Sequence, residues 1–236
     1  MGIVKENTVA EVVSKKLGSD HIFSKYKIDF CCGGGVTLET ACKEKGIAFE
    51  TLKHEIESLN NKIVGMPSLT DHDLGSLMQL AKTEYHPTIE RSFKEILPLA
   101  SKVANVHGEN HSEVITINEL LQEAGKQTDR TIASTLDRFF PAIDDILSLD
   151  NPSAEITFKQ METLRGAIDV ITAEKSPLVD LFNKIANLSS NYTVPEDACN
   201  SYRSLYQNLQ QLDFEVHKYI HFEKHVLIPK SLKIIE

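Results

Sequence analysis

The sequence predicts an all-α protein, with a small helical N-terminal domain followed by a bundle of about four long helices. Apolar residues recur at the three- and four-residue spacing of amphipathic helices along most of the chain. No segment shows a sustained alternation of apolar and polar residues bounded by turn residues, which is the pattern of a strand. Gly, Pro and Ser within residues 61–70 predict a linker. We therefore expect two domains, at 1–62 and 70–236.

Residues 7–60 have the pattern of short helices. The first apolar stripe ends at Gly18, Thr37 can cap a later helix, and the last helix is expected from about Phe49 to Leu59. Between these helices, Cys31 and Cys32 are followed by three consecutive glycines. Glycine permits positive φ angles, so this stretch is expected to form a tight turn.

The region after Thr70 is expected to be almost entirely helical. Pro87 and Pro98 make the segment up to His107 a poor candidate for one straight helix. Asp150-Asn151-Pro152 is a favourable start for the third long element. Lys175-Ser176-Pro177 could interrupt that element.

The last amphipathic segment, Leu212 to Pro229, has a carboxylate in the middle of its apolar face. This residue is Glu223, and a bare buried carboxylate costs several kcal/mol. We therefore expect a metal ion, a cation or a strong hydrogen-bond donor to face it. His217, His221 and His225 fall on the opposite, polar side of the same helical wheel. They could form a metal site, but the favoured interpretation is a row of solvated side chains.

Composition excludes several classes of function. The net charge is −9 and no run of Lys or Arg occurs, which argues against binding to nucleic acid or to an anionic membrane surface. The chain has neither a signal peptide nor an apolar run of roughly 18 residues, so we expect a cytoplasmic protein with no membrane span. The four cysteines are then expected to be reduced.

Two interpretations of the adjacent cysteines remain open. Cys31 and Cys32 could be a reactive dithiol or a site for a soft metal, because a glycine turn exposes both sulfurs and its amides can stabilise a thiolate. Alternatively, they are two small buried hydrophobic residues beside a turn. Neighbouring cysteines cannot comfortably pair with each other, so a disulfide is not expected.

Four stretches together resemble the iron–sulfur cluster repair di-iron proteins, the RIC/ScdA family. They are KYKIDFCCGGGVTLETAC, EYHPTIERSFKEILPLASKVANVHGENH, SNYTVPEDAC and HFEKHVLIPK. The resemblance implies a cytoplasmic, often dimeric protein with a hemerythrin-like bundle. In that family a non-haem di-iron centre in the bundle serves the repair of clusters damaged by nitric oxide or oxidants.

The family's iron ligands are only partly present in this chain. The resemblance matches His86, His107 and Glu223 to retained ligand positions. The remaining positions hold residues that are poor ligands for iron at neutral pH, namely Thr131, Thr135, Lys175 and Tyr219. His86 and His107 are also separated by about 30 Å if the helix between them is unbroken, and they can share a site only if the chain bends.

We favour the hypothesis of a bundle with no metal, in which a cation–carboxylate pair of Lys175 and Glu223 replaces the structural role of iron. Tyr219 would donate a hydrogen bond to Glu223 or fill volume, and the two threonines would satisfy their own hydroxyls. A second hypothesis is a partial iron site formed by His86, His107 and Glu223. A third is a complete di-iron centre built from other residues, which we consider the least favoured.

The resulting functional prediction is a divergent member of the repair family that acts in nitrosative or oxidative stress. It would act through Cys31 and Cys32, or by associating with a ligand-complete paralogue, and its client would be a damaged iron–sulfur protein. The resemblance also implies that a homodimer is possible. The alternatives are an iron-binding metalloprotein with the reduced site and a non-catalytic interaction scaffold. No enzymatic reaction is assigned, and we lean towards a protein that is not an enzyme.

Overall fold

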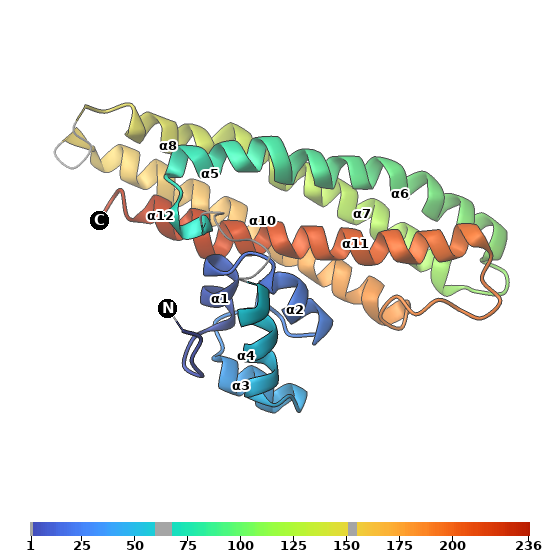
Figure 1. The fold of residues 1–236 in the computed structure, drawn as a ribbon. Coiled ribbons are helices and arrows are strands. Elements are labelled where there is room, and N and C mark those ends of the chain that lie inside the picture. The colour runs from blue at the N-terminus through green and yellow to red at the C-terminus, as the bar shows by residue number, and fades with distance from the viewer. Residues whose placement is uncertain (1, 60–67, 151–154) are drawn as a thin grey trace. The chain divides into compact units, whose positions relative to one another are not determined.

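The computed structural model describes residues 2–59, 68–150 and 155–236. These residues form helices joined by loops (Figure 1), and the only extended pairing within those ranges is an isolated bridge between Thr8 and Thr37. The predicted all-α fold is therefore confirmed. Most of the predicted linker, and the predicted helix start at Asn151-Pro152, lie outside the described residues.

The chain forms two compact units. The first comprises Met1–Gln79 with His217–Lys233, and the second comprises Leu80–Val216 with Ile234–Glu236. The end of the last long helix therefore belongs to the same unit as the N-terminal residues. The predicted domain boundaries at 62 and 70 flank residues 60–67, which the structure does not describe, and they stay a prediction.

Four short helices build most of the first unit. They are α1 (Val9–Lys15), α2 (Ser19–Lys25), α3 (Leu38–Lys45) and α4 (Phe49–Ser58). Thr8 and Glu11 form a capping box at the start of α1, and the Thr37 hydroxyl accepts a hydrogen bond from the amide of Thr40, as its sequence position predicted. Side chains with no exposed surface make the core of this unit: Val9, Phe23, Leu38, Leu52 and Ile56.

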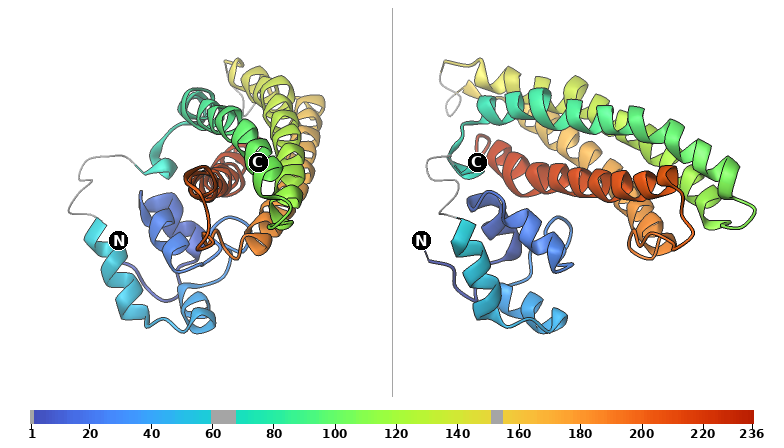
Figure 2. Two further views of the ribbon diagram at one scale, coloured as in Figure 1. Left: turned by 90° about the vertical axis from the view of Figure 1, so that its right-hand side faces the viewer. Right: turned by 45° about the vertical axis from the view of Figure 1, so that its right-hand side comes forward.

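The second unit is built from long helices that run side by side (Figures 1 and 2). The helix α7 (Glu113–Ser134) packs against α6 (His86–His107) and α10 (Phe158–Leu188), and α10 also contacts α8 (Phe140–Leu147). The last long helix, α11 (Asn200–Phe222), contributes buried apolar side chains every three or four residues, including Leu205, Leu209 and Leu212. This is the bundle that the periodicity predicted.

A five-residue π-helical segment precedes a proline in three of the long helices. The segments are η3 (Ala81–Tyr85), η4 (Thr135–Phe139) and η5 (Glu223–Leu227), and the prolines are Pro87, Pro141 and Pro229. Each proline is the second residue of the α-helix that follows, namely α6, α8 and α12 (Ile228–Leu232). A proline lacks an N–H group and its ring clashes with the carbonyl four residues earlier, and the wider π turn accommodates both.

Two expected helix interruptions are wrong. The helix α6 continues from His86 to His107 with Pro98 inside it, and α10 continues through Pro177. Pro98 lies on the exposed side of α6, where water can satisfy the carbonyl that loses its helical partner. Buried residues on the opposite side, such as Phe93, Ile96 and Ala100, hold the helix in the bundle. Tertiary packing thus outweighs the local penalty of proline.

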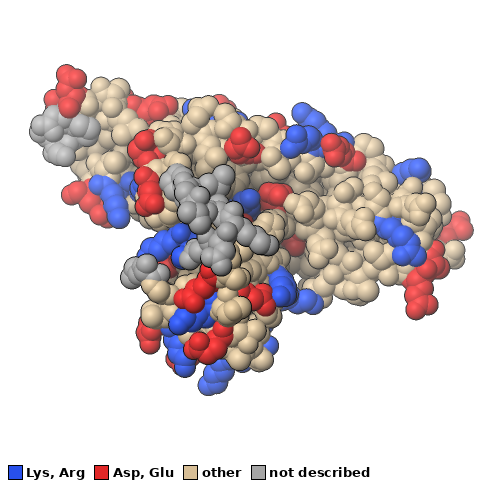
Figure 3. Space-filling view, viewed as in Figure 1, with Lys and Arg blue, Asp and Glu red and all other residues tan. Residues whose placement is uncertain are grey.

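Acidic and basic side chains are interspersed on the face of the molecule shown in Figure 3. Among the described residues, no helix combines the length and the apolar character needed to cross a membrane. The prediction that the protein does not bind nucleic acid stays a prediction.

Candidate thiol site

The two adjacent cysteines lie in the loop between α2 and α3, within the first unit. The chain reverses at the end of α2, where Lys27 has a φ angle of 54° and the amide of Ile28 donates to the carbonyl of Phe23 at 2.9 Å. The Gly34 position needs glycine, because a Cβ atom there would come within 2.5 Å of the carbonyl oxygen of Phe30. A turn is present here, since the amide of Val36 donates to the carbonyl of Gly33 at 3.2 Å, but none of the three glycines adopts the positive φ angle on which the expectation was based.

A single carboxylate organises the amides of this loop. Asp29 Oδ1 accepts hydrogen bonds from the amides of Cys31 (3.0 Å) and Cys32 (2.9 Å), and its Oδ2 accepts from the amide of Gly33 (2.8 Å). Burial acts to raise the pKa of Asp29, but the amides of Cys32, Gly33 and Cys31 together lower it below its usual value. Asp29 is therefore ionised at neutral pH and fixes the backbone around both cysteines.

The two thiols have different environments. Cys31 is 1% exposed, Cys32 is exposed, and both are free thiols. The Cys31 Sγ–H donates to Cys32 Sγ at a distance of 3.4 Å. The structure thus supports a different arrangement from either two exposed sulfurs or two buried ones, because one thiol is covered and the other is open to solvent.

These environments separate the acidities of the two thiols. The hydrogen bond from Cys31 lowers the pKa of Cys32 to about 7, and the positive charges of Lys224 and His217 lower it further, against opposing effects of burial and of Asp29. The pKa of Cys31 is raised, first by the hydrogen bond to Cys32 and then by burial and by the charge of Asp29. Near neutral pH, Cys32 is a partly ionised thiolate and Cys31 is its protonated donor.

Three side chains near the end of the last long helix bind three consecutive carbonyls of the loop. His221 Nδ1 lies 2.9 Å from the carbonyl oxygen of Phe30, His225 Nε2 lies 2.7 Å from that of Cys31, and Lys224 Nζ donates to that of Cys32 at 3.1 Å. A carbonyl oxygen can only accept a hydrogen bond. His221 Nδ1 and His225 Nε2 must therefore each carry a proton in these contacts. The loop is thus held on both sides, through its amides by Asp29 and through its carbonyls by this helix.

The prediction that the row of His217, His221 and His225 is solvated is wrong. His221 is 1% exposed, and the ring centroids of His221 and His225 are 5.0 Å apart. A helical wheel identifies the polar side of a helix, but it cannot show that distant residues of the chain cover that side. The Cys31–Cys32 loop and α1 do so here, and Ser14 Oγ of α1 lies 3.2 Å from His221 Nε2.

Burial keeps His221 neutral by lowering its pKa to about 4. Because Nδ1 carries the proton that reaches Phe30, Nε2 must accept, and the Ser14 hydroxyl is then the donor to it. The Ser14 hydroxyl also lies 2.8 Å from the carbonyl of Ala10, so its single proton is shared between two acceptors. His221 therefore connects α1 to the cysteine loop without a charge.

Thr131 and Thr135, which the resemblance predicts to stand at ligand positions, form hydrogen bonds within their own helix. Thr131 Oγ1 donates to the carbonyl of Gln127 at 3.0 Å, and Thr135 Oγ1 donates to that of Thr131 at 2.9 Å. Both residues are buried. Both hydroxyls therefore find hydrogen-bond acceptors in their own helix, as the hypothesis from the sequence required.

His86 and His107 are not brought together. They are the first and last residues of the unbroken helix α6, so about 30 Å separates them along its axis. His86 is buried and stacks on Phe140, whereas His107 Nε2 lies 3.1 Å from Cys199 Sγ at the other end of the helix. One metal ion cannot be bound by both histidines at this separation, which argues against the expected His86, His107 and Glu223 site; that site stays a prediction.

The remaining bundle positions are buried. Glu223 has no exposed surface and is the first residue of the π-helical segment η5, Tyr219 is 3% exposed, and Lys175 is 6% exposed within α10. Glu223 and Tyr219 belong to the first compact unit and Lys175 belongs to the second. The burial of Glu223 agrees with the sequence, and its pairing with Lys175 stays a prediction.

These residues do not fit a di-iron centre. The hydroxyls of Thr131 and Thr135 are neutral and donate to backbone carbonyls, and Lys175 brings a cationic side chain that has no lone pair for a metal while protonated. His107 lies a full helix length from His86. Within the described ranges, no group of three or more His, Cys, Asp or Glu side chains is arranged to hold a metal ion.

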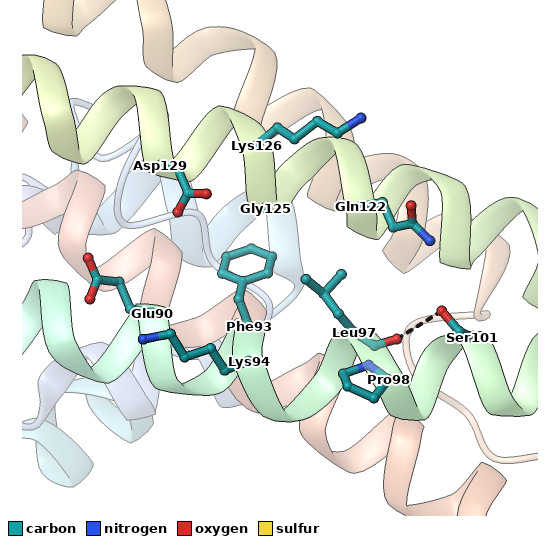
Figure 4. Close-up of a pocket in the computed structure, with 10 residues that line it drawn as sticks. All are labelled: Glu90, Phe93, Lys94, Leu97, Pro98, Ser101, Gln122, Gly125, Lys126 and Asp129. Atoms are coloured by element: carbon teal, nitrogen blue, oxygen red, sulfur yellow. Dashed lines mark hydrogen bonds between the residues drawn. The ribbon is translucent and has the colours of Figure 1, made fainter.

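An open pocket of about 640 Å³ lies in the second unit, between α6 and α7 (Figure 4). A Cβ atom at Gly125 would lie 3.4 Å from the ring of Phe93, in ordinary van der Waals contact. The charged side chains around it have both signs and do not converge on one point in Figure 4; they are Glu90, Lys94, Lys126 and Asp129. The pocket is therefore a weaker candidate for the functional site than the two cysteines.

Sequence reasoning found the two cysteines but not the residues that position them. The position of Asp29, two residues before the first cysteine and four before a glycine, is a turn signal that could have identified it. No local signal connects His221, Lys224 and His225 with a loop about 190 residues earlier. The contacts by which these three side chains position the loop appear only in the folded chain.

Comparisons with known proteins identify relatives of this chain. Residues 5–60, which include the cysteine loop, match the family model ScdA_N, described as a domain of unknown function (DUF542). The iron-sulfur cluster repair protein ScdA of Staphylococcus haemolyticus is 33% identical over 231 residues, which is 97% of this chain and 99% of that protein.

More distant relatives also match over nearly the whole chain. The probable iron-sulfur cluster repair protein of Haemophilus influenzae is 24% identical over 229 residues, covering 96% of this chain and 97% of that protein. The iron-sulfur cluster repair protein YtfE of Yersinia pestis is 24% identical over 217 residues, or 90% of each chain. With the identity and coverage of the staphylococcal relative, these matches show that the chain belongs to the ScdA family of iron–sulfur cluster repair proteins.

Proposed function

We propose that this protein takes part in the repair of damaged iron–sulfur clusters, and that the Cys32 thiolate is the group that contacts the damaged cluster. The observation that carries this proposal is the exposure of Cys32, together with a pKa lowered to about 7. A thiolate is the natural ligand of cluster iron and a strong nucleophile. Relatives named for cluster repair supply the substrate class. We place this activity in the cytoplasm, where the four cysteines would stay reduced.

The test measures the recovery of an enzyme whose [4Fe–4S] cluster has been damaged by nitric oxide or peroxide, in the presence of the purified protein. We expect Cys32→Ser to abolish the recovery, because the hydroxyl does not ionise at neutral pH. Cys199→Ser is the matched control, since Cys199 is also exposed but lies in the second unit. Recovery that is equal with wild type and Cys32→Ser would contradict the proposed role of the thiolate.

We further propose that the bundle works without a complete di-iron centre. The self-satisfied hydroxyls of Thr131 and Thr135 and the separation of His86 from His107 support this proposal. Elemental analysis after expression in iron-replete medium tests it. Less than one iron per chain in the Cys31→Ser/Cys32→Ser double variant would agree, whereas two irons per chain with the near-ultraviolet bands of an oxo-bridged pair would contradict it.

The partner is a damaged iron–sulfur protein in this proposal. A homodimer, or a complex with a ligand-complete paralogue, would bring di-iron chemistry to the same client without iron in this bundle. Sedimentation of the protein alone and mixed with such a paralogue distinguishes these assemblies. A single monomeric species in both samples would contradict both.

A further inference from the structure

The two sulfurs of the cysteine loop are close enough to bind the same metal ion. The distance between Cys31 Sγ and Cys32 Sγ is 3.4 Å. Two sulfurs that each lie about 2.3 Å from a tetrahedral metal are roughly 3.8 Å apart. Cys32 is exposed, and a small rotation of its side chain would cover this difference.

The loop is held in place mainly through its backbone, although the Cys31 thiol also interacts with the Asp29 side chain. Asp29 binds the amides on one side, and His221, Lys224 and His225 bind the carbonyls on the other. A ligand pair that is held in advance loses little conformational entropy on binding a metal. Cys31 approaches the ion from the covered side and Cys32 from the solvent side.

We propose that Cys31 and Cys32 form a bidentate site that takes one ferrous ion from the damaged cluster. The inference rests on the proposed function and names the substrate of the same site. Two protein sulfurs leave two positions on a tetrahedral ion for ligands that the iron brings with it. Thiolate sulfur is the ligand type that selects iron in cluster proteins.

The transfer is a ligand exchange with no change in oxidation state. An iron held by two client thiolates and two other ligands meets Cys32, whose thiolate forms the first new Fe–S bond and displaces one client thiolate. The Cys31 thiol then forms the second bond, and its proton goes to the second client thiolate as that group leaves. Two Fe–S bonds form and two break, and one proton moves from Cys31 to the client.

The involvement of Cys31 separates this inference from the proposed function. As a simple nucleophile, Cys32 would act alone, and the buried Cys31 would only donate a hydrogen bond to it. As a chelate, both sulfurs are required to retain iron. Cys31→Ser keeps a hydroxyl donor of similar size, so the loop can keep its contacts while the second iron ligand is lost.

The test uses ferrous iron added with excess glutathione under argon, followed by desalting and measurement of iron per chain. We expect about one iron per chain for the wild type, and at least a tenfold loss for Cys31→Ser and for Cys32→Ser. Cys42→Ser, a buried cysteine in the same unit, and Cys199→Ser are the matched controls and should retain iron. Iron should also protect wild-type Cys32 from iodoacetamide.

Retention of iron by Cys31→Ser at the wild-type level would overturn the chelate, and so would a wild type that binds no iron. Far-ultraviolet circular dichroism checks that each variant is folded, and the protection of Cys32 in the wild type provides a measurement that needs no variant. Cluster repair by Cys31→Ser at the wild-type rate would overturn the chelate and leave the proposed function standing. Iron binding by both sulfurs without any cluster repair would overturn the proposed function and leave the chelate standing.

Discussion

At the scale of single residues, the chemistry of Cys32 depends on neighbours in its own loop and on one side chain near the end of the chain. Cys31 donates to its sulfur, Asp29 fixes its backbone amide, and Lys224 binds its carbonyl and adds a positive charge. The negative charge of Asp29 alone would disfavour a thiolate. The neutral thiol of Cys31 and the cation of Lys224 outweigh it, which explains why the exposed sulfur ionises near neutral pH.

The role of Lys224 can be tested by the pH dependence of thiol alkylation. We expect the rate of reaction of Cys32 with iodoacetamide to rise with pH, with a midpoint at about 7. Lys224→Gln removes a charge that favours the thiolate, so the midpoint should move upward. Interactions of exposed charges are worth about 0.2–1 kcal/mol, so the increase should be below about 0.7 pH unit. Lys233→Gln, an exposed lysine nearby in the sequence, should leave the midpoint unchanged; an equal shift in both variants would contradict a specific role for Lys224.

The neutral state of His221 predicts a loss of stability in mild acid. Its pKa is about 4 in the folded protein, below the ordinary value of about 6.5 in the unfolded chain. Between these values only the unfolded chain takes up the proton, so the free energy of unfolding should fall by about 2 kcal/mol between about pH 7.5 and pH 5. The charges near His221 are those of Asp20, which opposes this shift, and His225, which adds to it.

Urea unfolding at the two pH values provides the measurement. His221→Asn keeps an N–H group for the carbonyl of Phe30 and does not titrate, so most of the pH dependence should disappear. His54→Asn changes an exposed histidine in the same unit and should keep the wild-type dependence. An unchanged dependence in His221→Asn would show that other groups cause the loss.

At the scale of elements, periodicity predicted the helices well and proline positions predicted their ends poorly. The amphipathic stripes of α4, α7 and α11 and the cap at Thr37 follow from local sequence. The expected breaks at Pro98 and Pro177 are wrong, because packing of the buried face holds both helices together. The π-helical segments before Pro87, Pro141 and Pro229 were not predicted, because no simple sequence rule distinguishes a proline that widens a helix from one that ends it.

The two prolines of α6 should respond differently to substitution. Pro98 is exposed in the interior of a continuous helix, where proline is about 3 kcal/mol less favourable than alanine. The lower entropy of the unfolded chain with proline returns about 0.4–1 kcal/mol, so Pro98→Ala should raise the free energy of unfolding by about 2–2.6 kcal/mol. Pro87 directly follows the π segment, whose wider turn accommodates the missing N–H group and the ring, so Pro87→Ala should give no such gain. Denaturant unfolding of both variants tests the contrast, and a larger gain for Pro87→Ala would contradict it.

At the scale of the whole molecule, the sequence predicted the class of fold and the family but only part of the site. Cys31 and Cys32 were found because two cysteines and three glycines are adjacent. Their positioning by His221, Lys224 and His225 depends on contacts between residues about 190 positions apart. A helical wheel places these residues on the polar side and has no information about what covers it, which is why the histidine row was expected to be solvated.

The hypothesis of a retired metal site makes a last prediction about Glu223 and Lys175, which are both buried. If they are paired, Glu223→Gln or Lys175→Met alone leaves one buried charge uncompensated and should cost about 3–5 kcal/mol. The double variant removes both charges, so it should cost less than the sum of the two by about 1–3 kcal/mol in urea unfolding. Lys175→Met combined with Glu196→Gln, an exposed carboxylate, is the control and should be additive. Additivity within about 0.5 kcal/mol for the first pair would show that Lys175 has not replaced iron as the partner of Glu223.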